Sequence, residues 1–200
     1  MKRRLLSLCL FAILCLTSHA SAFSQTSAPV GKLINDQGEC TIIKGRLVET
    51  NLLSETPGEH SVTYAYDVLS SDLDHSDTVW GEDDSEYITA YLTLHYSTVR
   101  TPTEYRLNEV SGKWVDPDPN DGTKADNTAE VFAVCRGIGT DNFFKNQTIT
   151  KNVSNHFSFD TGFTKYIHEN DMGSIGAKLT LGISQGSQRH WTLELSNYVF

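Results

Sequence analysis

The side chains that commonly carry catalysis are scattered through this 200-residue sequence and form no recognised catalytic motif. Of its seven histidines, His19 lies in an apolar N-terminal segment, and the other six are spread over polar positions and turn-rich stretches. The sequence contains no G-x-S-x-G nucleophile elbow, no H-E-x-x-H pair and no cysteine–histidine setting for a nucleophile. A solitary histidine on a strand is more often solvated than catalytic. We therefore expect neither enzymatic activity nor a cofactor.

One acidic stretch, residues 116–122, carries oxygen ligands at alternating positions, as calcium-binding loops do. The candidate ligands are Asp116, Asp118 and Asn120. The glycine of this stretch stands one place late for an EF-hand, and the twelfth position is Asn127 rather than a bidentate glutamate. A solvated cluster of turn residues is the alternative interpretation, since Asp, Asn, Pro and Gly all favour turns.

The N-terminus has the form of a secretory signal peptide. Three basic residues at positions 2–4 precede an apolar segment of roughly a dozen residues, and Ala20 and Ala22 suit a cleavage site. The apolar segment is too short to span a membrane. We therefore expect residues 1–22 to be removed and residues 23–200 to form one secreted domain.

Charge and cysteine content follow from this processing. Loss of the three basic residues changes the formal net charge from −9 to −12, which makes nucleic acid a poor partner. The cysteines left in the mature chain are Cys40 and Cys135. In an oxidising compartment two cysteines most simply form one disulfide. Two buried free thiols are the alternative, because the prediction rests on the compartment alone.

The elements that would position these groups show the period of strands, and no segment shows a convincing helical period. Alternating or β-branched runs predict strands at residues 40–49, 62–68, 87–99, 105–110, 131–135 and 191–199. Turn-forming or loose composition predicts irregular segments at residues 23–37, 70–86 and 114–127. Short strands with turn signals between them indicate an all-β fold, specifically an antiparallel β-sandwich.

The clearest alternation lies within residues 153–195. Apolar side chains occupy odd positions and polar ones even positions on both sides of a polar, glycine-containing break at 168–174. Two such runs around a break predict one long β-hairpin. The apolar face comprises Phe157, Phe159, Phe163, Ile167, Ile175, Ala177, Leu179, Leu181 and Ile183. The opposite face carries Ser158, Asp160, Thr164, Lys178, Thr180 and Ser184.

This hairpin has the dimensions of a transmembrane element, since a tilted β-strand crosses a bilayer with about 9–11 residues and one apolar face. In that interpretation the apolar face meets lipid, the polar face lines a lumen, and Trp191 is an interfacial anchor. A single hairpin leaves backbone groups unpaired in lipid, so several copies must close into a barrel. The alternative is an ordinary hairpin of a sandwich, which shows the same alternation.

The residues around the hairpin resemble the stem region of the leukocidin/haemolysin family of β-pore-forming toxins, over residues 143–200. The matching residues before the break are Lys145, Asn146, Asn152, Val153, Ser154, Phe157, Phe159, Asp160 and Gly162. Those after it are Ala177, Lys178, Leu179, Ser184, Arg189, Trp191, Thr192 and Tyr198. The resemblance implies a secreted monomer that binds a target-cell membrane, assembles into a homo-oligomeric ring and releases one stem hairpin per protomer. Family members continue past the stem into a membrane-binding rim, for which we expect no counterpart here.

Two functions are therefore compatible with the sequence. One is a secreted pore-forming toxin that inserts a β-hairpin from each protomer into a target membrane. The other is a secreted, non-lytic β-sandwich binding module, such as an adhesin or inhibitor, with a protein or glycan receptor. Its contact residues would come from the tyrosine-rich strands, since aromatic faces suit sugars and proteins. These tyrosines are Tyr64, Tyr66, Tyr87, Tyr91 and Tyr96.

Overall fold

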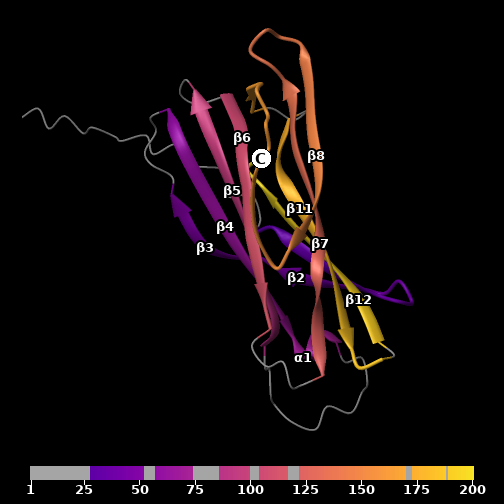
Figure 1. Ribbon diagram of the computed structural model, residues 1–200. Helices are drawn as coiled ribbons and strands as arrows, with labels where there is room; N and C mark the ends of the chain where they lie inside the picture. The colour runs from indigo at the N-terminus through magenta and orange to yellow at the C-terminus, as the bar shows by residue number, and fades with distance from the viewer. Residues whose placement is uncertain are drawn as a thin grey trace, which may run out of the picture.

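The protein is an antiparallel β-sandwich, which confirms the predicted fold class (Figure 1). The computed structural model describes residues 28–51, 57–73, 86–99, 104–116, 122–169, 173–187 and 189–200. The expected signal peptide at residues 1–22 lies outside these ranges. Figure 1 shows an elongated molecule in which the hairpin of strands β7 (Thr123–Ile138) and β8 (Phe144–Ser154) reaches one end.

Sheet A has six strands in the order β2-β1-β12-β11-β7-β8. Their bounds are Cys40–Lys44 for β2, Val30–Asn35 for β1, Arg189–Tyr198 for β12, Ser174–Gln185 for β11, Thr123–Ile138 for β7 and Phe144–Ser154 for β8. All of these neighbours pair antiparallel. Strand β11 therefore lies inside the sheet, and β2 and β8 are its edges.

Sheet B has the order β10-β6-β5-β4-β3, with β9 also paired to β6. Their bounds are Ile167–His168 for β10, Glu104–Val115 for β6, Glu86–Val99 for β5, Gly58–Leu69 for β4, Arg46–Asn51 for β3 and His156–Asp160 for β9. The helical turn α1, Ser70–Leu73, follows β4. Among the described residues, no helix is long and apolar enough to cross a membrane.

The core lies between the two sheets and is filled by their inward-facing side chains. In β5 every second residue from Ile88 to Leu94 is fully buried, as the alternation of a strand requires. Sheet A contributes Leu179 and Leu193 from the opposite side. Each such side chain stabilises the fold by about 1.5–3 kcal/mol through removal of apolar surface from water.

Residues 40–49, predicted as one strand, form two strands in different sheets. The chain changes sheet at Gly45, whose N–H donates to the carbonyl oxygen of Pro29 at 2.8 Å. A Cβ at Gly45 would lie 2.7 Å from that oxygen and 2.9 Å from the Tyr66 ring. Only glycine fits so close to a ring and a backbone oxygen, so the crossover is fixed at this position.

Other boundaries also differ from the sequence predictions. The segment 23–37, predicted as loose, contains β1, which is held between β2 and β12. The predicted loop 114–127 is shorter in the structure, because β6 continues to Val115 and β7 begins at Thr123. The short strand predicted at 131–135 is the middle of the 16-residue β7. The other predicted strands lie in β4, β5, β6 and β12.

The predicted hairpin within residues 153–195 is wrong as a strand pair. Its first half supplies β9 and β10, which pair with β6 in sheet B. Its second half supplies β11, which pairs with β7 and β12 in sheet A. The segment between β9 and β10 is irregular. The alternation identified the apolar face of each half, but it contains no information about which strand pairs with each half.

Candidate binding surfaces

The apolar face predicted to meet lipid is part of the sandwich core. Seven of its residues are buried: Phe157, Ile167, Ile175, Ala177, Leu179, Leu181 and Ile183. Phe159 and Phe163 are partly buried against the same core. Because the two halves belong to opposite sheets, their apolar side chains face one another across the core. In this structure the apolar face of the predicted stem is therefore a part of the sandwich core.

Of the residues predicted to line a lumen, Ser158 and Asp160 lie on β9 of sheet B and Thr164 in the irregular segment after it, whereas the other three lie on β11 of sheet A. Ser158, Asp160 and Thr164 are exposed, whereas Lys178, Thr180 and Ser184 are partly buried on sheet A. Lys178 Nζ lies 3.0 Å from Glu194 Oε1 on the neighbouring strand β12. In this arrangement the polar side chains therefore do not line a common lumen.

Trp191, predicted as an interfacial anchor, is buried in the core. It stands on β12 opposite Ile183 of β11 and Asn35 of β1. Its ring therefore stabilises the interior of sheet A and makes no surface that a bilayer could contact.

The predicted disulfide is also wrong, because Cys40 and Cys135 are both free. They lie on β2 and β7, and β1, β12 and β11 separate those strands. Four strand spacings amount to roughly 19 Å, whereas the Cα atoms of a disulfide lie within about 7 Å. Cys40 is exposed and Cys135 is buried. The disulfide was predicted from the expected oxidising compartment, but the order of strands holds the two cysteines too far apart to form it.

The calcium candidate is only partly within the described residues. Asp116 lies in them, directly after β6, whereas Asp118 and Asn120 lie outside. Among the residues that the structure describes, no three acidic, histidine or cysteine side chains gather as a metal site would require.

The tyrosine-rich strands do not present a tyrosine face to solvent. Tyr66 and Tyr96 are buried, and Tyr64 packs against the core. Burial raises the pKa of Tyr66 and raises that of Tyr96 to about 12, so both phenols stay neutral. Tyr91 lies on the outer face, with Lys113 Nζ 4.9 Å from its ring centroid. The side chain of Tyr87 lies outside the described part of the chain.

The outer face of sheet B carries a polar network near one end of β5 and β6. Asn108 Nδ2 donates to Glu59 Oε2 at 2.6 Å, and Arg106 Nε donates to Asn108 Oδ1 at 2.9 Å. The Arg106 guanidinium also lies 4.8 Å from the centroid of the Tyr166 ring. These groups satisfy one another, so this network is explained without a ligand.

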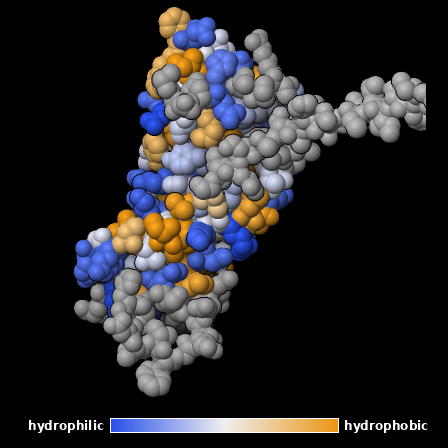
Figure 2. All heavy atoms as spheres, turned by 180° about the vertical axis from the view of Figure 1, so that it is seen from behind, coloured by the Kyte–Doolittle hydropathy of each residue, from blue (hydrophilic) through white to orange (hydrophobic). Residues whose placement is uncertain are grey.

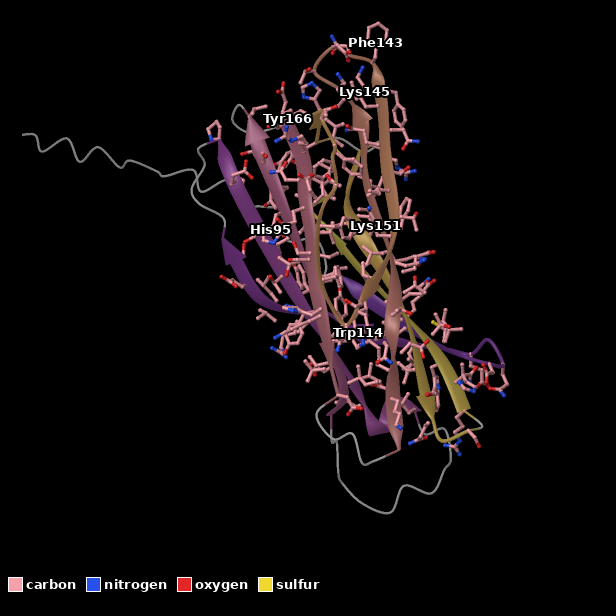
Figure 3. The ribbon with its side chains drawn as sticks, in the orientation of Figure 1. His95, Trp114, Phe143, Lys145, Lys151 and Tyr166 are labelled. Carbon is pink, nitrogen blue, oxygen red and sulfur yellow. The ribbon has the colours of Figure 1, made fainter. Side chains whose placement is uncertain are left out.

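The tip of the β7–β8 hairpin has a different character. Phe143 and Phe144 are adjacent in the chain and are 70% and 57% exposed. Figure 3 shows Phe143 at the far end of the hairpin, and Figure 2 shows hydrophobic and hydrophilic surface side by side at that end of the molecule. An isolated exposed apolar residue is ordinary, but two adjacent phenylalanines on a projecting tip form a candidate contact surface.

The turn beneath the two phenylalanines is well defined by hydrogen bonds. Asn142 has a left-handed φ of 61°, which Asn tolerates better than most residues. Gly139 N donates to the carbonyl oxygen of Phe143 at 2.8 Å, and the Phe143 N–H donates to Asp141 Oδ1 at 3.1 Å. Lys145 Nζ lies 2.6 Å from Asp141 Oδ2. The hydrogen bond from Lys145, aided by the Phe143 N–H, lowers the pKa of Asp141.

This tip was not among the residues singled out from the sequence. The available signal was a polar turn, residues 139–142, followed directly by two aromatic residues. Consecutive large apolar residues break the alternation of a strand, so at least one of them must face solvent at a sheet edge. That reasoning depends on knowing that a strand begins at residue 144.

Comparison with protein-family models, curated proteins and solved structures finds no match to this chain. The resemblance to the leukocidin/haemolysin stem therefore stays a prediction.

Proposed function

We propose that this chain is a secreted, non-lytic β-sandwich binding module that docks on a target membrane through Phe143 and Phe144. The observation that carries the proposal is the exposure of these adjacent side chains at the projecting end of the β7–β8 hairpin. Their turn is ordered by its own hydrogen bonds, so little conformational entropy is lost when the tip makes contact.

A bilayer interface suits the shape and charge of this tip. Aromatic and aliphatic side chains that project from a surface bury themselves at the boundary of head groups and acyl chains. The mature chain is acidic, with a formal net charge that goes from −9 to −12 once the three basic residues at positions 2–4 are lost, so anionic lipids would repel it. We therefore expect a zwitterionic surface and a contact driven by apolar burial.

The expected affinity is modest. Full burial of two phenylalanine side chains contributes about 3–6 kcal/mol in total, at about 1.5–3 kcal/mol each. A single acyl chain binds a membrane with a constant of about 10⁴ M⁻¹, and this binding is reversible because the buried apolar surface is small. The tip would hold the module on a membrane only transiently unless several copies act together.

The packing of the predicted stem supports a non-lytic module over a pore-forming toxin. Strand β11 is paired with β7 on one side and β12 on the other, and Ile175, Leu179 and Leu181 are fully buried. Its release would break both ladders and expose side chains worth about 1.5–3 kcal/mol each. Whole domains are stable by only about 5–15 kcal/mol, so release of β11 amounts to unfolding.

The test is sedimentation of the mature protein, residues 23–200, with phosphatidylcholine vesicles that contain a trapped dye. We expect the protein to sediment with the vesicles and no dye to leak. The double variant Phe143→Ser/Phe144→Ser should bind at least about tenfold more weakly, a loss of about 1.4 kcal/mol. Val115→Ser removes an apolar residue that is 44% exposed elsewhere on the sandwich, and it serves as the matched control.

Each contrary result has a distinct meaning. Absence of the protein from the vesicle pellet would overturn the membrane as partner. Equal binding by the double variant would overturn the tip as the contact. Dye leakage with ring-shaped particles in electron micrographs would favour the pore-forming toxin instead.

A further inference from the structure

Strand β3 is an edge of sheet B with exposed apolar residues. It pairs with β4 on one side, and among the strands that the structure describes the order of sheet B ends at β3. Leu47 and Val48 are 50% and 47% exposed. Figure 1 shows β3 at the outer side of the sheet, with β4 as its neighbour. An exposed edge strand that carries apolar side chains is a template for another strand.

The two edges of sheet A differ from β3 in this respect. Strand β8 carries Lys145 and Lys151 and no acidic residue, and lysines on an edge strand discourage pairing with a second copy. Strand β2 is only five residues long and ends in Lys44. Strand β3 instead has a charged residue of each sign, one on either side of its apolar pair.

The sequence of β3 is complementary to itself in the antiparallel sense. In a two-fold pairing centred between Leu47 and Val48, Arg46 stands opposite Glu49 of the second copy, and Leu47 opposite Val48. Arg46 and Glu49 share the outer face of the sheet, because their partners on β4 are Ala65 and Thr63. Residues directly opposite in a pair lie on one face, so each arginine would meet a carboxylate.

We propose that β3 is a self-association edge, at which two copies of this chain join about a two-fold axis through antiparallel β3 strands. In such an interface the same patch serves both partners. The inference does not depend on the proposed membrane contact.

Two features of β3 limit this association to a weak dimer. The register shifts between Leu47 and Glu49, so Val48 is an extra residue in a β-bulge, and a bulge interrupts the regular pairing of an edge. The contact therefore rests on the side chains at its centre, with backbone pairing confined to a short segment. Six residues also supply less area than the 1,200–2,000 Å² or so of a standard interface.

Arg46 already contacts its own chain, which affects the choice of variants. Its Nη2 lies 3.0 Å from Asp67 Oδ2 on β4, so the guanidinium is held at the outer face. Substitution of Arg46 alone therefore changes an internal ion pair as well as the proposed contact. Glu49→Arg leaves that ion pair intact and is the cleaner single change.

The test is analytical ultracentrifugation of the mature protein over a concentration series. We expect a concentration-dependent dimer for the unaltered chain. Glu49→Arg and Arg46→Glu should each weaken association by about tenfold or more, because like charges then stand opposite one another. The control is Lys124→Glu, which changes the charge of an exposed residue on β7 and should leave the dimer constant unchanged.

The decisive measurement is dimerisation in an equimolar mixture of the two single variants. In a mixed pair, both carboxylates of one copy face both guanidinium groups of the other, so dimerisation should recover. A folding defect in either variant would not be repaired by mixing. A chain that stays monomeric up to about millimolar concentration, or single variants that dimerise like the unaltered chain, would overturn the proposal. With both variants shown to be folded by circular dichroism, a mixture that fails to recover would also overturn it.

Discussion

The side-chain amide of Asn197 on β12 donates a hydrogen bond to the carbonyl oxygen of Leu92 on β5, at 3.0 Å, and so joins the two sheets across the core. The same amide nitrogen lies 3.2 Å from the carbonyl oxygen of Val62 on β4. Tyr66 Oη donates to the carbonyl oxygen of Ser196 in the opposite direction, from sheet B to sheet A. Asn197 is fully buried, so these bonds are formed without competition from water.

Replacement of this amide should destabilise the fold. Asn197→Ala removes both hydrogen bonds and leaves a small void, so we expect a loss of about 1–3 kcal/mol in the free energy of unfolding. Urea denaturation followed by circular dichroism measures it. Asn152→Ala, at an exposed position on β8, should change stability by no more than about 0.5 kcal/mol. Equal stability of the two variants would show that the sheets are not held at this point.

Hydrogen exchange should distinguish a stable sandwich from a fold that can release the predicted stem hairpin. Because β11 is paired on both sides, we expect its amides to exchange only through global unfolding. The outer amides of the edge strand β3 should exchange faster. The measurement is native-state exchange read by mass spectrometry. If the β11 amides exchange through an opening whose free energy is well below that of global unfolding, β11 can be released and the pore-forming toxin is favoured.

The sequence was sufficient to predict the faces of the strands and the class of fold. In β5, the alternation of Leu92 and Leu94 with Thr93 predicted correctly which side chains are buried. In β11 the alternation likewise placed Ile175 and Leu179 on one face, but the structure buries that face in the core, where the prediction had it meet lipid. Period two is a local property, so it is visible in a single chain without knowledge of its neighbours.

The pairing of strands and the exposed tip could not be predicted in this way. Phe157 and Leu179 both face the core, but from different sheets, because the choice of neighbour depends on long-range packing. The distance between Cys40 and Cys135 depends on the same strand order. Exposure of Phe143 required knowledge of where the β7–β8 hairpin turns.

Cys40 and Cys135, the two cysteines of the expected mature chain, should differ sharply in reactivity. Cys40 is exposed, whereas burial raises the pKa of the Cys135 thiol, which donates to the carbonyl oxygen of Lys165 at 3.7 Å. Less thiolate and less access both slow reaction. A thiol-reactive chromophore should therefore label one cysteine in the folded protein and two in denaturant. No labelling in denaturant without a reductant would indicate a disulfide after all.

Acid should destabilise the protein through His60. Its ring is buried and stacked on Tyr96, with centroids 5.3 Å apart, and Nε2 lies 2.9 Å from Thr98 Oγ1. Burial lowers the pKa of His60 below the usual 6.5, although the negative charge of Glu59 opposes this shift. Below pH 6.5 the unfolded chain therefore binds a proton at His60 more readily than the folded chain does. The free energy of unfolding consequently decreases as the pH is lowered.

His60→Phe tests this dependence, since it retains a ring against Tyr96 and cannot titrate. We expect the free energy of unfolding of the unaltered chain to fall faster than that of the variant between about pH 7 and pH 5. Above pH 7 the difference between the two proteins should be constant, because the histidine is neutral in both states. Urea denaturation at a series of pH values measures both curves. Parallel curves over the whole range would mean that His60 takes up its proton as readily in the folded protein as in the unfolded chain.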